Sequence, residues 1–300
     1  MKLIFFISMN NSYRLLPWVI LLALAFIWGS SFILMKRGLE VFSATQVASL
    51  RIFIAFISLI PFLIFQYKYM IGPKAKWLFL VGLFGNGIPA FLFTRAQLGL
   101  SSAVTGMLNS LTPLFTLILS VLVFQAKTKT INIVGVIIGL LGACGLIFFN
   151  GSADFSGSIG YAIYVVIATL MYAVSVNVIK KHLQEIDSVV IASCAFSFVG
   201  PLSGVYLFSG DFISVVKSKP ESWKAMGYIS VLAVIGSAFS VIIFNRLIKM
   251  TNALFASSVT YLIPVVAMFW GALDGEQILF IHFVWISIIL AGVYLVNVQK

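Results

Sequence analysis

Apolar runs of about twenty residues recur along the whole chain, and a helix of that length crosses the hydrocarbon core of a bilayer. Hydrophobic residues make up 61% of the 300 residues and charged residues only 9%. Soluble domains, by contrast, are about one-quarter charged. No hydrophilic stretch long enough for a second domain is left between the runs. The sequence therefore predicts an all-α integral membrane protein that forms one membrane domain.

The chain also carries an internal duplication, which self-similarity at a fixed spacing reveals. Residues 93–125 align without a gap on residues 244–276. A few distinctive residues coincide, although the overall identity of the two segments is low. Upstream, Gly85 coincides with Gly236 at the same spacing. The other coinciding marks are Phe93-Thr94-Arg95 with Phe244-Asn245-Arg246, Leu111 with Leu262, Pro113 with Pro264, and Phe124-Gln125 with Gly275-Glu276.

The duplication divides the chain into two halves of five spans each, so ten transmembrane helices are expected in a 5+5 repeat. The predicted domains are a cytoplasmic N-terminus over 1–14 (with Met9 as an alternative start to Met1), a first repeat over 15–149, a linker over 150–158 and a second repeat over 159–300. The predicted spans cover 15–35, 43–66, 75–94, 101–124, 131–149, 159–179, 188–208, 224–245, 251–271 and 278–298.

Because five is an odd number, the two repeats are expected to enter the membrane from opposite sides, as in an inverted repeat. With the N-terminus inside, the inner segments hold 12 of the 19 basic residues and the outer segments hold 6, while Arg51 lies within a span. Basic residues are more frequent in cytoplasmic loops, so both termini are expected in the cytoplasm and the loop 209–223 outside. The basic residues that give the net charge of +11 therefore indicate how the chain is oriented in the inner membrane, and they do not indicate nucleic acid as a partner.

Several residues together resemble a known family. The chain has Trp28-Gly29 followed by Phe32 in the first span, and Arg51 in the second. Pro113 and Pro264 lie in the fourth and ninth spans, and the acidic Glu276 follows the second proline. This pattern resembles the EamA-type branch of the drug/metabolite transporter superfamily over essentially the whole chain. The resemblance implies ten helices, an inverted repeat, a central cavity and transport of amino acids, metabolites or drugs.

The chain departs from that family pattern at one position. The first repeat has Gln125 where the second has Glu276. Any role that a carboxylate plays at the first position is therefore absent or is passed to Glu276.

Polar and aromatic residues inside the spans are the candidates for a solute site. A charge inside a span usually faces the bundle interior or water, so Arg51 is a candidate, with snorkelling to the nearer interface as the alternative. Asn86 is expected to face either a cavity or a neighbouring helix. The candidate substrate-binding residues are Trp28, Ser31, Arg51, Asn86, Asn109, Thr112, Tyr172, Asn177, Ser257 and Tyr261, and the candidate kink or gating residues are Pro89, Pro113 and Pro264.

The expected function is passage of a small organic solute across the membrane by alternating access. The alternatives are an integral membrane enzyme acting on lipids and a non-transporting scaffold, but the clustered His, Asp, Glu or Cys that such an enzyme needs is not found. No catalytic residue, cofactor or metal site is predicted. Cys144 and Cys194 both lie in apolar runs, which argues against a disulfide. The expected partners are the solute and the lipid bilayer, and the expected state is a monomer.

The acidic residues bear on how such transport is driven. The eight Asp and Glu residues all fall in predicted loops or at predicted helix ends. A proton-driven carrier typically holds a titratable acid within the membrane. The sequence therefore favours transport driven by the solute gradient or by exchange.

Overall fold

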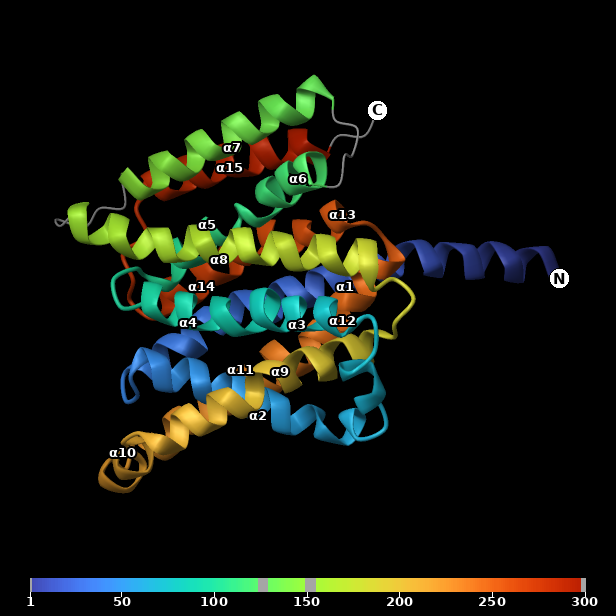
Figure 1. The fold of residues 1–300 in the computed structure, drawn as a ribbon. Coiled ribbons are helices and arrows are strands. Elements are labelled where there is room, and N and C mark those ends of the chain that lie inside the picture. The colour runs from blue at the N-terminus through green and yellow to red at the C-terminus, as the bar shows by residue number, and fades with distance from the viewer. Residues whose placement is uncertain (1, 124–128, 149–154, 298–300) are drawn as a thin grey trace.

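The computed structural model describes residues 2–123, 129–148 and 155–297, and these residues form helices without any strand (Figure 1). The elements of the first repeat are α1 (Lys2–Leu39), α2 (Ala44–Leu63), η1 (Tyr67–Met70), α3 (Ala75–Gly82), η2 (Leu83–Gly87), α4 (Ile88–Ala96), α5 (Ser102–Asn109), α6 (Thr112–Leu122) and α7 (Thr130–Phe148). Those of the second are α8 (Phe155–His182), α9 (Ser188–Ser209), α10 (Phe212–Ser218), α11 (Ser222–Ala233), η3 (Val234–Phe239), α12 (Ser240–Met250), α13 (Ala253–Ser257), η4 (Ser258–Tyr261), α14 (Ile263–Leu273) and α15 (Phe280–Asn297).

Eight helical segments in the described part of the chain are long and apolar enough to cross a membrane. Their bounds are Leu15–Leu39, Ala44–Leu63, Ala75–Ala96, Ser102–Leu122, Ile159–His182, Ser188–Ser209, Ser222–Met250 and Ala253–Leu273. The remaining two predicted spans correspond to α7 and α15, whose apolar parts are shorter and which pack against each other at one side of the bundle (Figure 1). The all-α membrane fold is confirmed, and the exact number of ten spans stays a prediction.

Three boundaries differ from those expected. The helix α1 begins at Lys2, well before the predicted first span, and its N-terminal part projects from the bundle (Figure 1). The helix α8 begins at Phe155, inside the predicted linker, whose residues 150–154 lie outside the described residues. The predicted outer loop 209–223 contains the short helix α10.

The backbone repeats the duplication that the sequence indicates. The π-helices η2 and η3 occupy equivalent positions, and each is a widened helical turn that continues into the next helix, η2 into α4 and η3 into α12. The N-cap side chains are equivalent too. Ser101 accepts from the backbone of Val104 before α5, and Asn252 accepts from that of Phe255 before α13. Each repeat therefore has its own π-helix and its own N-cap side chain at equivalent positions.

The two repeats run in opposite directions. The segment Ala75–Ala96 crosses the bundle as one continuous span, with Lys74 before it and Gln97 after it. Gln97 donates to the carbonyl of Phe32 near the end of α1 (3.1 Å), whereas Lys74 donates to the carbonyl of His182 at the end of α8 (2.9 Å). Since α1 and α8 are equivalent helices, their C-termini lie at opposite ends of the bundle. We call these the Lys36 end and the Lys180 end, after the lysines that close each helix.

Helix packing has the same twofold character. The helix α2 packs on its own equivalent α9, and α7 packs on α15. The contact of α4 in the first repeat with α8 in the second corresponds to that of α12 in the second repeat with α1 in the first. Both repeats therefore contribute to a shared core, and the axis that relates them passes through the middle of the bundle.

The widened turns depend on small residues. A Cβ at Gly85 would overlap the Ser175 hydroxyl, and one at Gly236 would lie 3.0 Å from the Ser31 hydroxyl. Ser31 and Ser175 are themselves equivalent positions on α1 and α8. Glycine thus allows each π-helix to approach the first helix of the other repeat closely.

We expect Gly85→Ala to lower stability by about 1–3 kcal/mol, because the added methyl group forces Ser175 to move. Melting of the purified protein in detergent measures this effect. Gly227→Ala on α11 is the control, since nothing lies within 4 Å of a Cβ there and alanine favours the helix. Adding Ser175→Ala to Gly85→Ala should recover part of the loss. Equal melting of the two glycine variants would contradict the packing described.

Candidate functional site

A cavity of about 1030 Å³, counted with the space at its open side, lies between the two repeats. Its wall takes residues from α1, α2, η2, α5 and α6 of the first repeat and from α8, α9, η3, α12 and η4 of the second. It is mainly apolar. Its polar lining side chains are Trp28, Ser31, Arg51, Asn86, Asn109, Thr112, Tyr172, Ser175, Ser237, Asn245, Ser257 and Thr260.

The aromatic wall is built as two equivalent pairs. Trp28 meets Phe244 edge to face, with ring centroids 4.9 Å apart, and Tyr172 stacks on Phe93 at 5.7 Å. Trp28 and Tyr172 occupy equivalent positions in the two repeats, as do Phe93 and Phe244. The indole of Trp28 also donates to the carbonyl of Gly236 in η3 (3.0 Å), which fixes the ring against the cavity. The repeat symmetry therefore places one large aromatic side chain of α1 and one of α8 at the cavity wall.

The two π-helices present their polar side chains in the same way. Asn86 donates to the carbonyl of Val81 (3.3 Å), and Ser237 donates to that of Leu232 (3.2 Å). Each acceptor lies five residues earlier, which is the spacing of a π-turn. Arg51 then donates from Nε to the Ser237 hydroxyl (2.7 Å), which links α2 to η3 across the two repeats.

Eight of the ten predicted binding residues line this cavity, namely Trp28, Ser31, Arg51, Asn86, Asn109, Thr112, Tyr172 and Ser257. Asn177 does not line it. Its amide donates to the carbonyls of Thr116 and Ala173 and accepts from Ser120, so it holds α8 against α6. Tyr261 lies in η4 and packs against the main apolar core.

Four polar lining residues were not predicted. Three of them, Ser175, Ser237 and Thr260, are the repeat equivalents of the predicted Ser31, Asn86 and Asn109. Applying the duplication to every candidate would have found them. The fourth, Asn245, follows Phe244 in the duplicated segment, and its amide nitrogen has no partner among the described residues. That buried, unpaired donor could not be recognised from the sequence.

The three predicted kink prolines lie at helix starts. Pro89, Pro113 and Pro264 are each the second residue of α4, α6 and α14. Pro113 and Pro264 each follow a break in the helix, so the expected kink is there a junction between two short helices. Pro89 instead follows the π-helix η2 directly, within one continuous span. The junctions before α6 and α14 meet, because Ser110 donates to the carbonyl of Thr260 (3.1 Å). Both irregular segments are thereby buried against each other beside the cavity.

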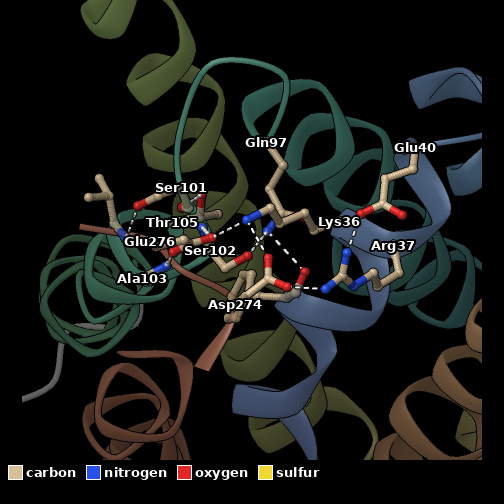
Figure 2. Close-up of polar contacts among 12 residues, drawn as sticks. Lys36, Arg37, Glu40, Gln97, Ser101, Ser102, Ala103, Thr105, Asp274 and Glu276 are labelled. Carbon is tan, nitrogen blue, oxygen red and sulfur yellow. Dashed lines mark hydrogen bonds and ion pairs between the residues drawn. The ribbon is translucent and has the colours of Figure 1, made fainter. Parts of the chain in front are cut away.

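A network of charges joins the two repeats at the Lys36 end (Figure 2). The Lys36 ammonium lies 2.6 Å from Asp274 and 3.0 Å from Glu276, and Arg37 also pairs with Asp274. The Glu276 carboxylate accepts from the backbone of Ser102 (3.0 Å) and Ala103 (3.2 Å) at the start of α5. These amides have no partner within their helix, so a carboxylate satisfies both. The network thus holds α1, α5 and the turn after α14 together.

The turn that carries both acids depends on Gly275. Its φ of +79° is in the left-handed region, where glycine is unstrained. The backbone of Glu276 bonds the Gly271 carbonyl (2.9 Å) and that of Gly275 bonds the Ala272 carbonyl (3.2 Å), which is a Schellman motif. The motif turns the chain sharply, so that Asp274 and Glu276 both reach Lys36.

Burial alone would raise the pKa of the Asp274 carboxyl. The hydrogen bond and charge of Lys36, together with the charge of Arg37, outweigh burial and hold that pKa below its usual value. A lowered pKa in the folded state means that the stabilisation is fully present above the usual Asp value and is lost as the pH falls through the lower one. Asp274 is therefore ionised at neutral pH.

The Lys180 end is joined differently. Lys180 donates to the carbonyls of Thr251 (2.6 Å) and Ile248 (3.3 Å), between α12 and α13. Lys74 donates to the carbonyl of His182, whose ring stacks on Trp77. In the part of the chain that the structure describes, the ion pairs are all at the Lys36 end. Gln125, the counterpart of Glu276, lies outside the described residues.

An inverted repeat of membrane-spanning helices around a central cavity, with irregular backbone beside that cavity, is the architecture of secondary transporters. The model of the EamA-like transporter family matches residues 16–148 and again residues 159–298. The chain therefore belongs to the EamA-like transporter family, and its two matches are the two repeats.

Similar proteins agree with this membership. The chain is 28% identical over 288 residues to the uncharacterized inner membrane transporter YedA of Escherichia coli K12, covering 93% of this chain and 90% of the relative. It is 25% identical over 285 residues to an uncharacterized transporter of Archaeoglobus fulgidus, covering 93% and 98%. One solved crystal structure shares the fold, with a TM-score of 0.66 at 15% identity over 93% of this chain and 95% of that chain.

We expect Glu276→Gln to lower the free energy of unfolding by about 1–3 kcal/mol. The change removes a carboxylate whose side chain is only 7% exposed, while Lys36 keeps Asp274 as a partner. Glu40→Gln is the matched control, because Glu40 is 52% exposed and pairs with Arg37 alone, so a change within about 0.5 kcal/mol is expected. Thermal melting at pH 7 compares them, and equal melting would contradict the importance assigned to the buried network.

Proposed function

We propose that this protein carries a small organic solute across the inner membrane by alternating access, with the cavity between the repeats as the solute site. The observation that supports the proposal most is the pairing of equivalent residues in the cavity wall. Trp28 corresponds to Tyr172 and Ser31 to Ser175, and all four line the cavity. A site on a pseudo-twofold axis can face either side of the membrane when one repeat rocks against the other.

In this proposal the structure represents the state that is closed at the Lys36 end. There the network of Lys36, Asp274 and Glu276 ties the repeats together. Opening that end separates these groups, and the lysine contacts at the Lys180 end remain. Conversely, opening the Lys180 end leaves the ion pairs intact. Closure at one end and opening at the other are the two conformations that alternating access requires.

The proposed orientation places both termini in the cytoplasm and the Lys36 end outside. Its support is the excess of basic residues in the inner segments, 12 against 6. Single cysteines at Ser12 and Ser218 in an otherwise cysteine-free chain should then react with an impermeant maleimide from opposite sides. In intact spheroplasts only the Ser218→Cys variant should be labelled. Labelling of both variants from one side would show that the proposed topology is wrong.

We expect Trp28→Ala to reduce solute flux at least tenfold without preventing insertion, because it removes much of one aromatic wall. Flux into proteoliposomes measures this, with amino acids tested first and cationic drugs next. Trp223→Ala is the control. Trp223 is 69% exposed on α11 and is not among the residues that line the cavity, so its loss should leave flux unchanged. Normal flux in Trp28→Ala would remove this cavity as the solute path.

A further inference from the structure

Arg51 brings a positive charge to the cavity without a matching negative charge. It is the single Arg or Lys among the described residues that line the cavity, and none of those residues is Asp or Glu. Its Nε donates to the Ser237 hydroxyl, but no described residue accepts from its two terminal nitrogens. The four ion pairs in the described part of the chain are all at the Lys36 end. The guanidinium therefore keeps most of its donors for something inside the cavity.

The fold itself does not require a base at this position. The equivalent residue of the second repeat is Ala195 on α9, which is fully buried. The helices α2 and α9 pack directly on each other, so the same environment accommodates an alanine. A charge inside a membrane bundle is expensive and is normally compensated. Since the bond to Ser237 turns Arg51 inward across the repeat interface, the side chain does not snorkel to the bundle end.

Asn245 provides a second and independent observation. The residue is 1% exposed and lines the cavity, and its amide nitrogen has no acceptor among the described residues. Other polar groups of the wall already donate to backbone carbonyls, as Trp28, Asn86 and Ser31 do. A buried donor without an acceptor is costly, and a ligand that brings acceptors relieves that cost. The Arg51 guanidinium and the Asn245 amide nitrogen are thus two lining donors that a bound acceptor would satisfy.

Aromatic and aliphatic side chains make up the apolar part of the wall. Trp28, Phe93, Tyr172 and Phe244 form the two ring pairs, and the rings of Phe32 and Phe196 line the cavity too. An apolar wall with one cation strengthens the attraction to an anion, because little water screens the charge. It also disfavours a cation, which would meet Arg51 and find no carboxylate.

We infer that the cavity takes an organic anion, with a carboxylate held by Arg51 and an apolar body lying against the aromatic wall. The inference rests on the proposed function and names its substrate class. Asn245 supplies a further donor to the polar atoms of the same solute. An amino acid fits this site less well than the corresponding simple carboxylate, because the described wall has no Asp or Glu to pair with its ammonium group.

Three probes of nearly equal size separate the effect of charge from that of shape. They are 3-phenylpropanoate, its neutral amide 3-phenylpropanamide, and 3-phenylpropylammonium. Each is titrated against the purified protein in phosphatidylcholine nanodiscs at pH 7.5, and saturable stabilisation against heating gives the apparent affinity. Phosphatidylcholine has no net charge, so these nanodiscs contain no anionic lipid headgroup that could occupy the site. Repeating the titration in phosphatidylglycerol nanodiscs shows whether such a headgroup competes for the same site.

The carboxylate should bind at least tenfold more tightly than the amide, and the ammonium should not bind. In Arg51→Gln the carboxylate should lose that advantage and match the amide, whereas Arg51→Lys should keep part of it. Ser237→Ala is a milder variant that removes only the hydroxyl to which Arg51 donates, and it should reduce the advantage without abolishing it. The charge preference of the unmodified protein tests the inference even where a variant fails to fold.

Preference for the ammonium, equal binding of carboxylate and amide, or an unchanged preference in Arg51→Gln would overturn the assignment. So would the absence of any response to 3-phenylpropanoate, indole-3-acetate and 2-oxoglutarate tested side by side. These outcomes differ from failure of the proposed function. If a neutral or cationic solute is transported and Trp28→Ala abolishes its flux, the proposed transport function is supported and the anionic substrate is wrong.

Discussion

Backbone groups in a bilayer have to be hydrogen-bonded within the protein, and this constraint organises the molecule. A regular helix satisfies it alone, so irregular backbone is affordable only where protein or a watery cavity surrounds it. The irregular segments here are the π-helices η2 and η3 and the junctions before α6 and α14. All four border the cavity. The irregular segments shape the wall of the cavity, and the protein and cavity around them supply the hydrogen-bond partners that lipid could not.

The twofold repeat accounts for most of the cavity wall, and the charged side chain of the wall is a departure from it. Equivalent positions hold Trp28 and Tyr172, or Ser31 and Ser175, which keep similar shapes on both sides of the axis. Arg51 faces no such partner, because its equivalent is Ala195. A symmetric scaffold gives two alternative conformations of similar energy. In the proposed function, residues without a like counterpart, such as Arg51, determine which solute the cavity holds.

The sequence predicted the architecture well because its signals are long and repeated. Apolar runs of membrane length and the gapless match of 93–125 with 244–276 led to the helical fold, the two repeats and most of the wall. Residues whose partner lies on another helix were harder to place. Asn177 is a polar residue within a span, yet its amide is hydrogen-bonded to Thr116 and Ser120 of α6. Nothing in the local sequence indicates these partners. Pro113 and Pro264 were predicted as kink or gating residues, and each begins a second short helix. Whether a proline kinks one helix or starts another depends on the residues packed around it.

The difference between the two bundle ends sets a requirement on the solute. A network worth about 1–3 kcal/mol more at the Lys36 end favours the state closed there by about 5- to 150-fold. In the alternating-access cycle proposed above, the carrier passes through both states, so solute binding has to offset a preference of that size. Arg51 belongs to the first repeat and Ser237 to the second, so their hydrogen bond crosses the interface between the repeats, which is the interface that moves in the proposed cycle. A solute held by Arg51 therefore acts on that interface directly, and its binding energy can favour one arrangement of the repeats over the other.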